Sequence, residues 1–176
     1  MPYPEKISRL CRSAEMITLA AIAVIILYGA YLVFDPSALP AVLSAGTPGL
    51  VSTPPGWAVA VAAALLALLA GIFIAGMWEV RRLFRLLASG SLGDAAFGRV
   101  LRKLGWLAIT GGIASILIRT ATALLMSVAN PPGQKILLIE ISSGQIASLI
   151  MGLLFFMFTH VFAEVARIDE DNKSII

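Results

Sequence analysis

The chain has 176 residues, of which 59% are hydrophobic and only 13% are charged, and its mean hydropathy is +0.94. A water-soluble domain of this size would need far more polar surface, so the composition indicates an integral membrane protein. The net charge of +3 does not indicate direct binding of nucleic acid, because the basic residues cluster beside apolar stretches, where they orient a membrane protein.

Four stretches are long and apolar enough for transmembrane helices, each of which needs about 20 mainly apolar residues. They lie at residues 14–34, 57–78, 104–129 and 143–167. The first is expected to be a retained helix rather than a signal peptide, because its apolar core exceeds the ~7–15 residues of a signal sequence. The chain is therefore predicted to be a single all-α transmembrane domain, a four-helix bundle made of two similar hairpins.

The distribution of Lys and Arg predicts that both termini are cytoplasmic. Basic residues precede the first span and are frequent in the connector 79–103, whereas the loop 35–56 has none and the loop 130–142 has only Lys135. The connector is therefore expected inside and both loops outside. Tryptophans, which favour membrane interfaces, mark predicted span ends: Trp57, Trp78 and Trp106.

Both outside loops are expected to pack partly on the outer face of the bundle. The loop 35–56 has the Pro and Gly of turns, but it keeps apolar residues that a wholly solvated linker would not need. These are Leu39, Val42, Leu43, Leu50 and Val51. The loop 130–142 is apolar and β-branched but too short for a further span, so an extended segment is expected there.

Small residues are frequent in the second span, and they let helix backbones approach closely in lipid. That span is therefore the expected central helix. Beyond it, the connector should continue the helix to Leu87, break at residues 89–93, and start a new helix capped by Asp94. On this new helix an apolar face is predicted, with Phe97, Val100, Leu101 and Leu104, opposite a basic face with Arg99, Arg102 and Lys103.

Arg119 lies within the third predicted span, about 20 Å from Trp106 and in its outer half. A charge at this depth usually faces a partner or water. Two interpretations stay open, a contact with a ligand or ion and extension of the side chain toward the outer interface. Its candidate partners are Glu140, Asp35 and lipid phosphate.

His160 and Glu164 are four residues apart in the fourth span and so share one helical face. This spacing suits a metal pair or a proton relay. One His and one Glu do not form a metal site without ligands from other helices, so a packing histidine near the interface is the favoured interpretation.

The two hairpins form a weak internal repeat. Arginines precede the first and third spans, and Glu-Val-x-Arg motifs end the second and fourth. A parallel repeat predicts an approximate two-fold axis along the membrane normal, although basic flanks also align by chance. Glu79 and Glu164 are expected to join a charged ring at the cytoplasmic boundary with the arginines that precede the spans: Arg9, Arg12, Arg99 and Arg102.

Two segments carry a resemblance to a known family. One runs from Leu83-Phe84 through Gly90 to the sequence LRKLGW at 101–106, and the other is the acidic ending at 163–176. Together with the four-span pattern they resemble a bacterial membrane family, domain of unknown function 2975. The Phe that the family has soon after Gly90 is missing, and Ser174-Ile175 stands where the family usually has Thr-Val or Thr-Ile.

The resemblance implies a multi-pass protein of the bacterial cytoplasmic (inner) membrane. Members are often encoded beside a small helix-turn-helix regulator, which implies that a cytoplasmic regulator is the partner. The tail ends apolar at Ile175-Ile176 after an acidic run, so it could dock in a groove of such a protein, although a frayed, solvated terminus is the simpler interpretation. The alternatives are a small transporter or channel built as a homo-oligomer, and a lipid-binding or immunity-type protein.

An enzyme is the least supported class. The sequence has no Ser/His/Asp set and no phosphate-binding loop, and it has one histidine and one cysteine, Cys11. A single cysteine excludes an internal disulfide and a cysteine-based metal cluster within one chain. No cofactor is expected.

Overall fold

The computed structural model describes residues 5–35, 37–45, 52–89, 95–131, 133–135, 137–139 and 141–173. Every regular element in those ranges is helical. In chain order these are α1 (Glu5–Phe34), α2 (Ala38–Ala45), α3 (Gly56–Ala88), α4 (Ala95–Met126), the 3-10 helix η1 (Ser127–Ala129) and α5 (Ser143–Lys173). In this part of the chain, α1, α3, α4 and α5 are long and apolar enough to cross a membrane, which confirms the predicted all-α membrane fold.

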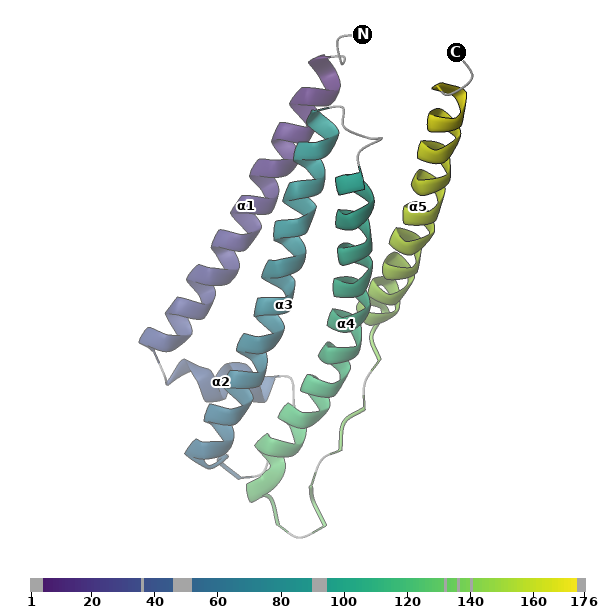
Figure 1. Ribbon diagram of the computed structural model, residues 1–176. Coiled ribbons are helices and arrows are strands. Elements are labelled where there is room, and N and C mark those ends of the chain that lie inside the picture. Colours follow the sequence, from purple (N-terminus) through teal and green to yellow (C-terminus); the bar gives the residue numbers. More distant parts are fainter. Residues whose placement is uncertain are drawn as a thin grey trace.

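The four long helices pack in the order of the chain, α1 on α3, α3 on α4 and α4 on α5. Figure 1 shows them as a row in which α1 and α5 occupy opposite edges, with the start of α1 and the end of α5 at the same end of the molecule. The two-fold arrangement expected from the hairpin repeat would instead bring α5 against α1. The two hairpins therefore share the same kinds of residue at their ends, with basic residues before the first helix and an acidic residue after the second. They do not pack symmetrically.

Helices α3 and α4 both lie between two neighbours, but α4 is more buried than α3, the helix of the second span, which was expected to be the central one. In the most apolar window of each helix, 33% of the residues of α4 are buried, against 11% in α3 and 6% in α5. The predicted faces of this helix are confirmed, because its apolar set Phe97, Val100, Leu101 and Leu104 is buried and its basic set Arg99, Arg102 and Lys103 is exposed. The expected cap Asp94 lies outside the described residues.

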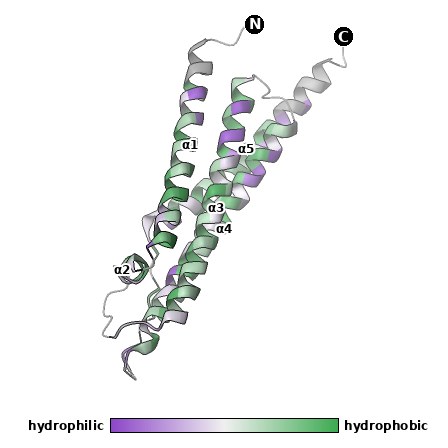
Figure 2. Cartoon of the chain, turned by 90° about the vertical axis from the view of Figure 1, so that its left-hand side faces the viewer, coloured by the Kyte–Doolittle hydropathy of each residue, from purple (hydrophilic) through white to green (hydrophobic). Residues whose placement is uncertain are grey.

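Helix α2 lies within the loop 35–56, where no helix was predicted, and packs on α3 and α4. Figure 2 looks along α2 and shows it crossing the long helices. Leu43 of α2 is buried with Ala62 of α3 and Met126 of α4, and Leu39 packs against the same cluster. Packing of this loop is thus confirmed for Leu39 and Leu43, whereas Leu50 lies, like Val51, outside the described residues.

The segment that links α4 to α5 begins with a turn, in which the backbone N–H of Gln134 donates to the carbonyl of Pro131 at 3.0 Å, and it then runs back along α4 (Figure 1). Asn130 fixes its start, because the buried Asn130 side chain accepts from the backbone N–H of Ser52 at 3.2 Å and donates to the carbonyl of Gln134 at 3.0 Å. As a result α5 begins beside the middle of α4.

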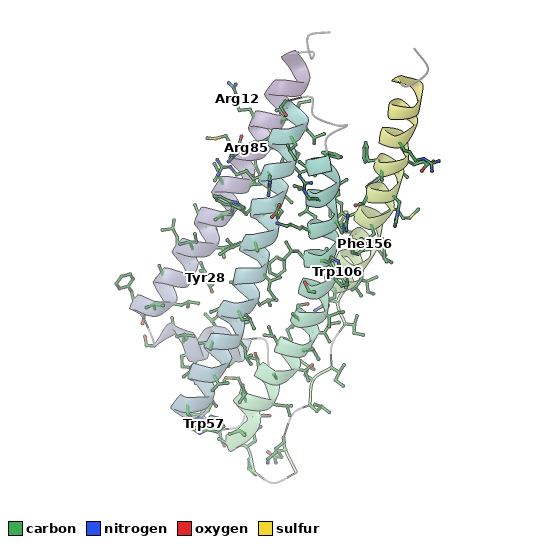
Figure 3. All side chains as sticks on the ribbon, viewed as in Figure 1. Arg12, Tyr28, Trp57, Arg85, Trp106 and Phe156 are labelled. Carbon is green, nitrogen blue, oxygen red and sulfur yellow. The ribbon has the colours of Figure 1, made fainter. Side chains whose placement is uncertain are left out.

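Helices α4 and α5 approach most closely at two glycines. A Cβ atom on Gly105 would lie 3.1 Å from the carbonyl oxygen of Gly152, and one on Gly152 would lie 3.0 Å from the oxygen of Gly105 and 2.6 Å from Cγ1 of Ile109. Beside the crossing, the rings of Trp106 and Phe156 meet edge to face at 5.6 Å between centroids (Figure 3). The absence of side chains at both glycines therefore sets the distance between the two helices.

We predict that Gly152→Ala lowers the free energy of unfolding by about 1–3 kcal/mol, the usual cost of overpacking, because the new methyl group must push α5 away from α4. The measurement is thermal unfolding of the purified protein in detergent. Gly71→Ala on α3 is the matched control, since a Cβ there meets nothing within 4 Å. Equal stability of the two variants would contradict the close crossing.

Candidate functional site

Polar side chains cluster at two places. One is the charged ends of the helices, and the other is a groove between α3, α4 and α5. Figure 2 shows apolar residues along most of the length of the long helices and hydrophilic ones concentrated toward the end at which α1 begins. That end is the predicted cytoplasmic boundary. The groove lies deeper, within the apolar part of the row.

Glu15 ties α1 to α3 at the charged end. Its Oε1 accepts hydrogen bonds from Nε of Arg81 at 2.8 Å and from Nε of Arg85 at 3.0 Å. The side chains of Glu15 and Arg81 are only 24% and 20% exposed, and the Arg81 guanidinium also lies 5.3 Å from the centroid of the Trp78 ring, within the range of a cation–π contact. One carboxylate thus serves two arginines one helical turn apart.

Glu15 was not among the residues predicted to form a site. The sequence does place this acidic residue in the first turn of a predicted apolar span. A charge there costs free energy unless a cation faces it. The three arginines that follow the second span supply such cations: Arg81, Arg82 and Arg85.

Glu79 joins α3 to α4. Its Oε1 lies 3.4 Å from Nζ of Lys103, so it does reach the start of the third span, but through the lysine and not through Arg99 or Arg102, which are exposed. The Glu79 side chain is 13% exposed, and its Oε2 is buried with no hydrogen-bond partner among the described residues.

Glu164 pairs within its own helix. Its Oε1 accepts from Arg167 at 2.8 Å, and both side chains are more than half exposed. His160 is exposed one turn earlier, and the described residues bring no metal-ligating set of three side chains together. Arg12 is exposed (Figure 3), and the side chain of Arg9 lies outside the described part. The pairs thus differ from the expected ring and connect neighbouring helices of the row or stay within one helix.

Arg119 is exposed on α4, one turn beyond Ser115 in the outward direction. Of the partners considered for it, Glu140 lies outside the described residues, and Asp35 accepts a hydrogen bond from the Ser37 hydroxyl. Whether Arg119 serves a ligand or the outer interface stays a prediction.

The groove between α3, α4 and α5 has a volume of about 500 Å³. Its walls are apolar, with Ile72 and Phe73 on α3, Leu107 on α4 and Phe155 on α5 among them. Small residues widen it, including Gly76, Gly111 and Gly112. Four polar side chains collect where α5 begins: Ser115, Ser142, Gln145 and Ser148. No pattern in the sequence predicted the groove, apart from the polar run at residues 142–145.

A second cavity of about 440 Å³ lies between α1, α2 and α3. It is lined by aliphatic residues such as Ile25, Leu39 and Leu66, and Tyr28 (Figure 3) brings the one hydroxyl group among its lining side chains. Two cavities of similar size therefore differ in chemistry, since the first has a cluster of hydrogen-bonding groups at one end.

Comparison with known proteins gives one match. A family model described as "Protein of unknown function (DUF2975)" matches residues 53–176, which include α3, α4 and α5 and leave out α1 and α2. No curated protein matches the chain, and no solved structure does.

We predict that Glu15→Arg destabilises the protein and that Arg81→Glu in the same chain restores part of the loss, because the swapped pair again joins α1 to α3. Melting temperatures of the two single variants and the double variant in detergent measure this coupling. Glu164→Gln is the control and should cost no more than about 0.5 kcal/mol, as expected for an exposed pair within one helix. If the losses of stability in the two single variants simply add up in the double variant, Glu15 and Arg81 do not interact.

Proposed function

The chain belongs to the DUF2975 family, and from that premise we propose that it is a regulatory membrane partner of a cytoplasmic protein, held in the bacterial inner membrane. The observation that carries this proposal is the length of the helices at the charged end. Helix α3 continues ten residues past Trp78 to Ala88, and α5 is 31 residues long, from Ser143 to Lys173. Such extensions exceed what crossing a bilayer needs.

The charged end combines basic residues on α3 and α4 with an acidic run in the sequence of α5. Helices α3 and α4 present exposed basic residues: Arg82, Arg85, Arg99, Arg102 and Lys103. The end of α5 carries the acidic run Asp169-Glu170-Asp171 in its sequence. A surface with both signs of charge suits a protein partner better than nucleic acid, whose phosphates would repel the acidic run.

The arrangement of helices supports this function better than a transporter or channel. In the part of the chain that is described, α4 packs between its neighbours and the helices stand in a row, so one copy does not surround a pore. Transport would require several copies, with Arg119 or His160 facing a path between them. A transporter or channel built from several copies of the chain is therefore the second candidate function.

We predict that the charged end faces the cytoplasm, as the distribution of basic residues indicates. In a Cys11→Ser background, Gln134→Cys should react with a membrane-impermeant maleimide in intact cells. Ser89→Cys, which is also exposed, should react only after the membrane is permeabilised. The opposite pattern would place the extensions outside the cell and rule out a cytoplasmic partner.

We predict that deletion of residues 169–176 removes a specific cytoplasmic protein from crosslinked complexes purified out of native membranes, with recovery falling roughly tenfold or more, which corresponds to about 1.4 kcal/mol. A full-length variant with Asp169→Asn, Glu170→Gln and Asp171→Asn separates the charge of the tail from its apolar end. Thermal unfolding of each variant controls for folding. Recovery of self-crosslinks alone would favour the homo-oligomeric transporter.

A further inference from the structure

One face of α4 carries three cations and a tryptophan at the charged end of the molecule. Their spacing of three, four and seven residues from the first member places them on the same side of a helix. All four are exposed: Arg99, Arg102, Lys103 and Trp106. The apolar residues between them are buried on the opposite side of α4. This face therefore points away from the neighbouring helices of the row.

The contact between α3 and α4 adds a fourth cation to this face. Nζ of Lys103 lies 3.4 Å from Oε1 of Glu79 on α3. Arg82 follows Glu79 by three residues and so lies on the same side of α3, where its side chain is exposed. Four basic residues from two helices thus surround the pair of Glu79 and Lys103. We call them the basic cluster: Arg82, Arg99, Arg102 and Lys103.

The carboxylates at this end of the molecule neutralise little of the basic cluster. Among the described side chains, Glu15 and Glu164 pair with other arginines, and Glu79 pairs with the lysine. No described carboxylate pairs with the three arginines of the cluster. Four positive charges and the single negative charge of Glu79 leave a local net charge of +3. The cluster therefore suits an anionic ligand.

The basic cluster lies at the level of the lipid head groups. Tryptophans favour the membrane interface, and Trp78 and Trp106 are both about half exposed. Arg82 lies four residues beyond Trp78, about 6 Å along α3, and Lys103 lies three residues before Trp106, about 4.5 Å along α4. Both displacements lead from the apolar part of the helix toward the charged end. Basic residues grouped at this level attract anionic lipid.

Below the cations, the same face of α4 is apolar and open. Trp106, Ile113 and Leu117 are seven and four residues apart in turn, which keeps them on one side of the helix. All three are exposed. From Trp106 to Leu117 the helix rises about 16 Å, roughly half of the ~30 Å hydrocarbon core. This apolar stripe thus has the length of the acyl chains in one leaflet.

We propose that the basic cluster and the apolar stripe beneath it bind an anionic phospholipid with a single negative charge, a phosphatidylglycerol. Its phosphate accepts hydrogen bonds from Arg82 and Arg102, because the planar guanidinium group matches two phosphate oxygens at once. Lys103 adds a third positive charge. One acyl chain lies along Trp106 and Leu117. The site lies within this chain, so it does not depend on a cytoplasmic partner.

The test is binding of radiolabelled phosphatidylglycerol to the purified protein in detergent, with unlabelled competitors. Phosphatidylcholine with the same acyl chains should compete at least tenfold less well, because its choline group carries a positive charge that the basic cluster repels. Inorganic phosphate should not compete, because it lacks the chains that contact the apolar stripe. Equal competition by phosphatidylcholine, or displacement of the lipid by inorganic phosphate, would overturn the proposal.

Two double variants separate this site from general attraction to a basic surface. Arg99→Gln with Arg102→Gln should weaken binding of phosphatidylglycerol at least tenfold. Arg12→Gln with Arg167→Gln removes the same charge from exposed arginines of α1 and α5, and it should leave binding within about twofold. Melting temperatures show whether both variants fold. Equal losses in two folded double variants would contradict a site on α4.

Photolabelling locates the acyl chain in the unmodified protein and decides the proposal if the first double variant does not fold. A phosphatidylglycerol with a diazirine on one acyl chain should label α4 within residues 106–117, as shown by peptide mapping. The phosphatidylcholine analogue should label the lipid-facing sides of the four long helices without this preference. The same even labelling by both lipids would refute the assigned site.

Discussion

The close approach of α4 and α5 at Gly105 and Gly152 is the contact on which the geometry of the second half of the chain depends. With no side chain at either position, the backbones meet at a distance that a single methyl group would prevent. This contact holds α5 at a level where its first turn lies beside the middle of α4. The groove follows from that offset, because residues of α3, α4 and the start of α5 line it together.

The rest of the row is held by few buried residues, and lipid completes the environment. The most apolar windows of α1, α3 and α5 are only 6–11% buried, so most of their apolar side chains face the bilayer. Because lipid tails are as apolar as these side chains, burial gives little force between helices, and packing and polar contacts decide which helices meet. This explains why a single carboxylate, Glu15, matters for the position of α1.

The sequence predicted the four long helices well and their neighbours poorly. Hydropathy and tryptophan positions located the four long helices, and the 3.6-residue period located the buried face of α4. Hydropathy reports how far a residue lies from water but not which helix it meets, so the row and the interior position of α4 did not follow from it. Glycines illustrate the limit, because Gly71 and Gly76 face open space whereas Gly105 and Gly152 touch, and nothing in their local sequence separates the two kinds. The same limit hid the groove, because residues of three helices line it together.

The groove and the charged end are connected through α5. Among the long helices, α5 packs on α4, so a change in its tilt disturbs one helix interface, whereas a change in α3 would disturb two and the tie to Glu15. A molecule held in the groove would touch α3, α4 and α5 together and so would bear on the angle of α5, whose far end carries the acidic run in its sequence. It would shift that angle only by its difference in affinity for the two arrangements, and a factor of ten in affinity corresponds to about 1.4 kcal/mol.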